Sequence, residues 1–180
     1  YYNRPETSDY LFTWADFREK VNGELIGNLA NLVNRTLTFL GRYFDGKILD
    51  VSKEKGEEDE QTTVTALWAD VMAREEEITR HLERAEIREA FRKIFALSSL
   101  GNKVFQEHEP WKLRNDDPQR THRLLSHLAY LIRDLAILVE PYIPVTAERM
   151  AGFVGETDRS WKRLGQLTGL TAMGTPEILF

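Results

Sequence analysis

Residues 117–141 read DPQRTHRLLSHLAYLIRDLAILVEP, and this stretch decides the fold. Its leucines recur at alternating spacings of four and three residues, at Leu124, Leu128, Leu131, Leu135 and Leu138. That spacing lines the leucines up along one side of an α-helix and is typical of the seam of a helical bundle. Asp117 and Pro118 are a typical N-cap and first residue of a helix, and Pro141 predicts where the helix ends.

The chain before this stretch begins with a sequence that predicts one long helix. Thr13 and Asp16 form a capping pair at its start, and Phe44-Asp45-Gly46 supplies a glycine stop at its end. A broad apolar face indicates that the helix packs on a hydrophobic core. The residues of that face are Phe17, Val21, Leu25, Leu29, Leu32 and Leu40.

The same periodicity predicts three further helices, near residues 62–82, 87–105 and 144–154. In the second of these, Ser98 and Gly101 are small enough to let a neighbouring helix come close. Residues 53–60 read KEKGEEDE, contain no apolar side chain and are expected to form an exposed loop. No stretch shows the alternation that is typical of a β-strand.

These patterns predict an all-α fold, an antiparallel bundle of about five helices with an irregular C-terminal tail. We divide the chain into a connector at 1–13, the bundle at 14–155, and a tail at 156–180 that packs back on the body. We expect three of the four tryptophans to be core or packing residues. They are Trp14, Trp68 and Trp161.

The composition is that of a globular protein from a reducing compartment. The 180 residues include no cysteine, which excludes disulfides and thiolate metal sites. Acidic residues outnumber basic ones by 29 to 24, so a nucleic acid would have to be bound locally and not by a bulk positive field. No apolar run approaches the ~20 residues of a membrane helix. Because the first residue is Tyr1 and not Met, we expect a piece of a longer protein.

The sequence lacks the residues that several kinds of nucleotide and metal site require. There is no glycine-rich phosphate loop and no Glu-x-x-His pair, which argues against a nucleotide-binding loop and a di-iron bundle. The four histidines also lack the spacing of metal ligands. These histidines are His81, His108, His122 and His127.

Residues 27–35 combine polar side chains on one part of the first helix. They read GNLANLVNR, which puts Asn28, Asn31 and Arg35 on neighbouring turns at spacings of three and four. Amide and guanidinium groups can read the edges of unpaired bases. These three residues are therefore candidate nucleotide contacts.

Residues 109–112 read EPWK and follow the helix predicted near 87–105. We expect Trp111 to stand in a loop fixed by Pro110, where an indole could stack on an unstacked base. Four basic residues nearby could hold phosphates, although Asp116 and Asp117 dilute their charge. They are Lys112, Arg114, Arg120 and Arg123.

Each candidate also has a purely structural explanation. Arg35 could pair with a carboxylate, and Asn31 could be a solvated helix residue. Trp111 could be a lid over the end of the bundle. The residues alone leave both explanations open.

Eight segments in one order carry a family resemblance. They are residues 4–9 (RPETSD), 22–25 (NGEL), 31–35 (NLVNR), 44–46 (FDG), 87–90 (IREA), 101–102 (GN), 109–112 (EPWK) and 141–144 (PYIP). With them the chain resembles, almost end to end, the anticodon-binding helical domain of methionyl-tRNA synthetase, a class I aminoacyl-tRNA synthetase. The similarity is closer to the archaeal and eukaryotic branch of that family.

The resemblance implies roles for particular residues. In the family, the positions matching Asn31, Arg35 and Trp111 contact the anticodon, and the tryptophan stacks there. Asn28 and Pro110 are implied as neighbouring contacts. The implied partner is the anticodon stem-loop of tRNA(Met), whose anticodon is CAU, with no role for DNA or a membrane.

The parent protein implied by the resemblance is a cytoplasmic methionine–tRNA ligase. It activates methionine with ATP and Mg²⁺ and transfers it to tRNA. The catalytic HIGH-type and KMSKS-type sequences are absent from this chain. We therefore expect no catalytic residue, metal or cofactor in this piece, which would work with a catalytic domain of the same polypeptide.

Two alternatives stay open. The chain could be the anticodon-binding domain of another class I synthetase, or a helical protein-interaction bundle whose leucine seam and tail dock a partner helix. An RNA-reading role requires Asn31, Arg35 and Trp111 to converge on one solvent-facing patch. Burial of Trp111 on the far side of the bundle would remove its basis.

Overall fold

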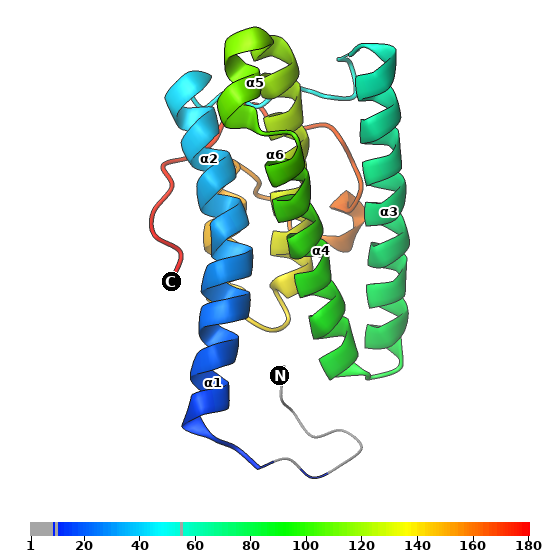
Figure 1. Cartoon of the computed structure of the whole chain (residues 1–180). Helices are drawn as coiled ribbons and strands as arrows, with labels where there is room; N and C mark the ends of the chain where they lie inside the picture. The colour runs from blue at the N-terminus through cyan, green and yellow to red at the C-terminus, as the bar shows by residue number, and fades with distance from the viewer. Residues whose placement is uncertain (1–8, 10, 55) are drawn as a thin grey trace.

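A computed structural model describes residues 9, 11–54 and 56–180 as an all-α bundle, which confirms the predicted fold class (Figure 1). The described residues contain no strand, only an isolated antiparallel bridge between Lys47 and Ala172. Within those ranges no helix is both long and apolar enough to cross a membrane. The elements are α1 (Trp14–Lys20), the π-helix η1 (Val21–Ala30), α2 (Asn31–Tyr43), α3 (Glu58–Glu83), α4 (Ile87–Glu107), α5 (Pro110–Asp116), α6 (Pro118–Val139), α7 (Pro144–Phe153) and the 3-10 turn η2 (Trp161–Arg163).

The helix α6 is the centre of the bundle. Asp117 caps it by accepting a hydrogen bond from the backbone N–H of Arg120 at 2.8 Å. Every residue from Leu124 to Val139 is buried, so the core surrounds the whole helix and not only the predicted leucine seam. Polar residues at this depth need partners inside the protein.

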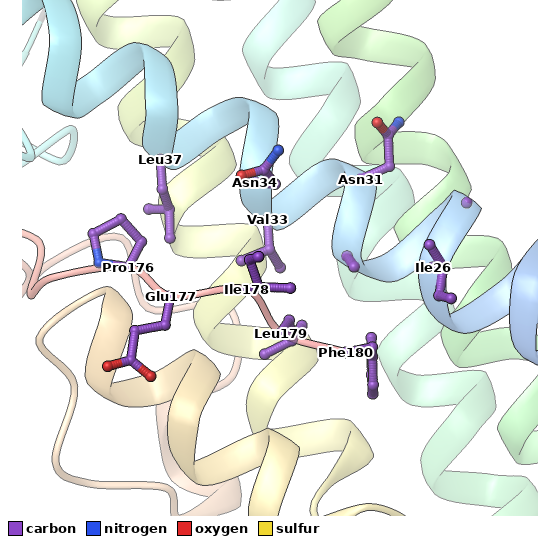
Figure 2. Close-up of a pocket in the computed structure, with 12 residues that line it drawn as sticks. Ile26, Asn31, Val33, Asn34, Leu37, Pro176, Glu177, Ile178, Leu179 and Phe180 are labelled. Carbon is purple, nitrogen blue, oxygen red and sulfur yellow. The ribbon is translucent and has the colours of Figure 1, made fainter.

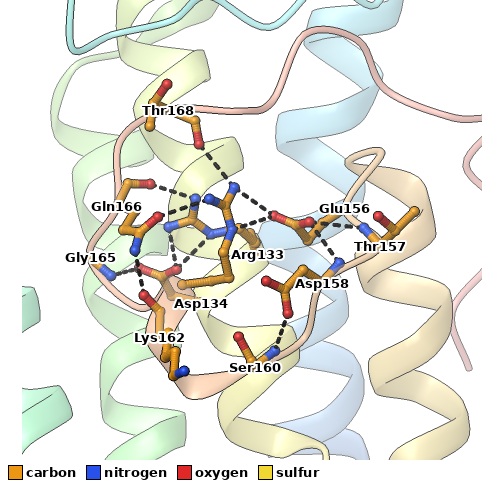
Figure 3. Close-up of polar contacts among 11 residues, drawn as sticks. Arg133, Asp134, Glu156, Thr157, Asp158, Ser160, Lys162, Gly165, Gln166 and Thr168 are labelled. Carbon is orange, nitrogen blue, oxygen red and sulfur yellow. Dashed lines mark hydrogen bonds and ion pairs between the residues drawn. The ribbon is translucent and has the colours of Figure 1, made fainter.

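Two buried charges of α6 hold the C-terminal segment against the bundle. Arg133 and Asp134 are fully buried and form an ion pair of 2.7 Å. Arg133 also donates to the carbonyl oxygen of Gln166, and the backbone N–H of Gly165 donates to Asp134 at 3.0 Å (Figure 3). These bonds attach the irregular C-terminal segment to the central helix.

A third carboxyl group, Glu75 of α3, is buried beside this pair. Burial, together with the negative charge of Asp134, raises the pKa of Glu75 to about 9, while the Arg133 charge acts in the opposite direction. The folded protein therefore holds a proton on Glu75 at neutral pH, whereas the unfolded chain releases it.

The first helix runs continuously from Trp14 to Tyr43, but its hydrogen-bond register changes on the way. Thr13 accepts from the backbone N–H of Asp16 at 3.1 Å, so the predicted cap is present. Residues 21–30 then form a π-helix before α-helical bonding resumes at Asn31. The helix ends where Gly46, at a left-handed φ of 70°, donates to the carbonyl oxygen of Leu40 at 3.0 Å.

The start of this helix lies outside the core, contrary to prediction. Phe17 is 50% exposed and Trp14 is 76% exposed, because α1 reaches past the end of α4 and its main contacts are with η1, the next segment of the same helix (Figure 1). These two rings pack mainly on one another and on Phe12. Of the three tryptophans predicted to pack, only Trp68 is buried, since Trp161 is 38% exposed.

The acidic run before α3 is only partly a loop. The helix begins at Glu58, several residues earlier than predicted, and carries three acidic residues in its first turn, where the helix dipole favours negative charge. Glu60 is buried and accepts two hydrogen bonds from Arg123, of 2.7 and 2.6 Å. The expectation of a fully exposed loop at 53–60 was therefore wrong for its last three residues.

The helices α2 and α4 pack closely at Gly101, as the small residues predicted. A Cβ atom at position 101 would lie 2.7 Å from Cδ2 of Leu32 and 2.9 Å from Cδ2 of Leu131. Ser98, one turn earlier, is fully buried. Gly101 therefore sets the distance between α2, α4 and α6.

We predict that Gly101→Ala lowers the free energy of unfolding by roughly 1–3 kcal/mol, because the added methyl group overpacks the core. Urea denaturation followed by circular dichroism measures this. Gly152→Ala is the matched control, since a Cβ atom there meets nothing within 4 Å. A Gly101→Ala protein as stable as the wild type would contradict the close approach.

We also predict that Glu75→Gln removes a pH dependence of stability. Because the pKa of Glu75 is raised on folding, its contribution to the free energy of unfolding is full below about pH 4.5. It declines as pH rises towards about 9, by at most about 1.4 kcal/mol per pH unit. Urea titrations between these limits should show a flatter profile for Glu75→Gln than for the wild type, with the exposed Glu76→Gln as control. Equal slopes in the wild type and Glu75→Gln would contradict the assignment.

Candidate nucleic-acid interface

The amide of Asn28 is directed towards α4. Its Nδ2 donates to the carbonyl oxygen of Phe95 and to Oγ of Ser99, both at 2.9 Å. Asn102 in turn donates to the carbonyl oxygen of Asn28 at 2.9 Å and to its Oδ1 at 3.2 Å. These bonds fix the end of η1 against α4, so Asn28 acts on the site by holding its neighbours.

Asn31, at the first turn of α2, uses only part of the hydrogen-bonding capacity of its side-chain amide. Its Nδ2 donates to Oδ1 of Asn102 at 2.9 Å, and its side chain is partly exposed. No other hydrogen bond links this amide to the described residues, so its second N–H and its Oδ1 are available to a ligand. Asn102 thereby determines which end of the Asn31 amide points outward.

Arg35 lies one turn further along α2, over an aromatic surface. Its Cζ is 4.2 Å from the ring centroid of Phe105 and 5.8 Å from that of Trp111. Its Nη2 donates to Oε1 of Gln106 at 3.1 Å, and no carboxylate of the described residues pairs with it. Partial burial lowers the pKa of Arg35, but the guanidinium remains charged near neutral pH.

Trp111 stands on a short helix and not in the loop that the sequence predicted. Pro110 is the first residue of α5, a position that proline favours, and it is buried. Glu109 before it adopts a left-handed φ of 43° and accepts backbone hydrogen bonds from Lys112 and Leu113. The indole is partly buried and stacks on Phe105, with centroids 6.2 Å apart and planes 29° apart.

The structure thus brings the three principal candidates to one region. Arg35 contacts the Trp111 ring, and Asn31 is on the next turn of the same helix. All three are partly exposed. Trp111 therefore lies on the same face as Arg35, and not on the far side of the bundle.

Sequence reasoning missed three residues of α4 that support this face. They are Asn102, which bonds Asn31; Phe105, which stacks with Arg35 and Trp111; and Gln106, which bonds Arg35. Their spacing of three and four residues was a usable signal, because it places them on one face of α4.

The four basic residues suggested for phosphate binding are in different situations. Lys112 pairs with Glu109 at 2.8 Å and Arg120 with Asp59 at 2.9 Å. Arg123 is held by Glu60 and is largely buried. Arg114 has no carboxylate partner among the described residues.

A cavity of about 530 Å³ lies on a neighbouring face of the first helix, between its middle and residues 176–180. Figure 2 shows Ile178 and Leu179 across from Val33, while the Asn31 amide points away from them. Asn31 and Asn34 are among the residues that line this cavity, most of the others are apolar, and Arg35 is not part of the lining. The described residues also contain no cluster of three acidic or histidine side chains able to hold a metal ion.

Comparison with known proteins agrees with this geometry. The family model for the anticodon-binding domain of methionyl-tRNA ligase matches residues 53–180, and that for class I tRNA synthetases of the methionine type matches residues 1–37. The apo form of Mycobacterium tuberculosis methionyl-tRNA synthetase superposes with a TM-score of 0.80, over 94% of this chain and 34% of that chain. At 23% identity, that likeness shows the fold alone.

Two curated relatives are more similar in sequence. The methionine–tRNA ligase of Treponema denticola is 45% identical over 201 residues, covering all of this chain and 25% of that protein. That of Borrelia duttonii is 43% identical over 181 residues, covering all of this chain and 24% of that protein. The chain thus spans about a quarter of the length of these relatives.

The fold and these matches define an anticodon-binding domain of a class I aminoacyl-tRNA synthetase. Within that class, the chain belongs to the methionyl-tRNA ligase family. This confirms the resemblance seen in the sequence and decides against a domain of another class I synthetase and against an interaction bundle. The division at residues 13 and 155 and the archaeal and eukaryotic affinity stay predictions, and residues 1–8 and 10 lie outside the described residues.

Proposed function

We propose that this domain reads the CAU anticodon of tRNA(Met) through Asn31, Arg35 and Trp111. The observation that carries the proposal is the outward-facing half of the Asn31 amide, one turn from a guanidinium that lies over the Trp111 ring. An amide offers both a donor and an acceptor, which is what the Watson–Crick edge of a cytosine requires. The arginine adds charged donors, and the indole supplies a stacking surface for the unstacked base.

The remaining candidates have supporting roles in this proposal. Asn28 holds the start of α2, and Pro110 opens the helix that presents the indole. Arg114, which has no carboxylate partner among the described residues, is the better candidate for a phosphate contact. The other three basic residues, Lys112, Arg120 and Arg123, would first have to release their carboxylate partners.

For the whole protein we propose the activity for which its relatives are named, methionine–tRNA ligation. The ligase would use ATP and Mg²⁺ at a catalytic domain of the same polypeptide, in the cytoplasm. We assign no chemical step to the present chain. Its contribution is the choice of tRNA, and its partner is the anticodon stem-loop of tRNA(Met).

Base reading can be separated from simple charge attraction by substitutions at two positions. Asn31→Ala and Arg35→Gln should each cost about 1–3 kcal/mol in kcat/KM for tRNA(Met), while methionine activation stays unchanged. Both should also reduce the penalty for replacing the cytosine of the anticodon. Arg35→Lys should not restore activity, because an ammonium group lacks the planar fork of arginine. Aminoacylation of wild-type and anticodon-changed transcripts by the full-length ligase measures all three effects.

Asn34→Ala is the matched control, since Asn34 is exposed on the same helix and bonds only to Thr38. It should charge both transcripts as the wild type does. Unchanged discrimination against the wrong base in Asn31→Ala and Arg35→Gln would reject these residues as readers, even if overall affinity fell.

A further inference from the structure

A second group of cationic and aromatic side chains lies beside the proposed reading site. Tyr43 is the last residue of α2, and the Cζ of Arg114, on α5, lies 4.4 Å from its ring centroid. The Cζ of Arg42 lies 5.5 Å from the same centroid. Two guanidinium groups from different helices therefore meet at one tyrosine ring.

Neither Arg42 nor Arg114 pairs with a carboxylate among the residues that the structure describes. The basic residues around them, Lys112, Arg120 and Arg123, all have acidic partners. Acidic residues outnumber basic ones in this chain, and many basic side chains have a carboxylate within reach. Two arginines that lack such a partner and lie at one ring are therefore well suited to bind an anionic ligand.

The Tyr43 ring orients the guanidinium groups of Arg42 and Arg114 before a ligand binds. Stacking on an aromatic face is favourable for a guanidinium and limits its freedom before a ligand arrives. The Nε of Arg114 is buried without a hydrogen-bond partner, so this arginine can address a ligand only through its terminal nitrogens. Arg42 is exposed, and Tyr43 is partly exposed.

The group is continuous with the reading site. Tyr43 packs on Phe39 at 5.3 Å, Phe39 on Phe105 at 5.5 Å, and Phe105 stacks with Trp111. Tyr43 also follows Arg35 by about two helical turns. A strand whose base lies at Trp111 would therefore pass directly beside this group.

We propose that Arg42, Tyr43 and Arg114 form a phosphate-binding subsite for the nucleotide next to the base read at Asn31, Arg35 and Trp111. This proposal rests on the proposed function of that site. The planar guanidinium fork matches two oxygens of a phosphodiester group. Because a phosphate contact carries no sequence information, the subsite positions the RNA strand and leaves the choice of base to the reading site.

The test is binding of a synthetic CAU anticodon stem-loop to the full-length ligase, measured by fluorescence anisotropy at several salt concentrations. Arg42→Gln and Arg114→Gln should each weaken binding roughly three- to tenfold. The slope of log K against log salt should become shallower by about 0.7 for each lost phosphate contact. Binding of a stem-loop with a changed first anticodon base should be weakened by the same factor.

Tyr43→Leu should also weaken binding although both charges remain, whereas Tyr43→Phe should not.

Two controls make the result decisive. Arg84→Gln removes the same charge at the turn between α3 and α4, at the opposite end of the bundle from α5 (Figure 1), and should bind as the wild type does. If it weakens binding as much as Arg114→Gln does, the effect is one of general charge and the subsite is rejected.

Trp111→Ala reports on the reading site itself. If it weakens binding while Arg42→Gln and Arg114→Gln do not, the subsite is rejected and the proposed function stands. If none of the three weakens binding, both are rejected.

Discussion

The close packing of α2 on α4 at Gly101 is the constraint on which the candidate site depends. Any side chain at that position would overlap Leu32 and Leu131 and push the helices apart. With glycine there, short amide side chains can bond directly between the helices, as Asn31 does to Asn102. Gln106 reaches Arg35 in the same way. The polar face is thus rigid before RNA arrives, which reduces the entropy lost on binding.

The net charge of −5 is unfavourable for RNA binding only when charge is averaged over the whole molecule. Several basic residues elsewhere are tied to carboxylates, as Arg123 is to Glu60 and Arg133 to Asp134. Arg35 and Arg114 instead stack on aromatic rings, which orient a guanidinium without cancelling its charge. The domain therefore keeps available positive charge at this face. Such a surface favours a local contact with a few nucleotides over non-specific attraction to any RNA.

Most of the fold could be predicted because its helices carry local signals. The leucine spacing and the Asp117–Pro118 start identified α6, and a glycine marked the end of the first helix. Features set by distant partners could not be predicted in this way: Glu60 is buried because of Arg123, and Asn31 is oriented by a residue 71 positions away. The π-helical register of 21–30 has no residue signature in this sequence, and EPWK suits a loop as well as a helix start. For the site, sequence supplied Asn31, Arg35 and Trp111, while their supports on α4 required the tertiary structure.

The proposed reading of the anticodon requires Trp111 to stack on an unstacked base. An NMR spectrum of the indole N–H groups of the ¹⁵N-labelled chain, titrated with a CAU anticodon stem-loop, tests this directly because the four tryptophans lie in different environments. We predict that the Trp111 signal shifts, while that of Trp68, which is buried and donates to His127 at 3.0 Å, stays unchanged. A bound stem-loop that leaves the Trp111 signal unmoved, or that shifts Trp14 or Trp161 in its place, would contradict stacking at Trp111.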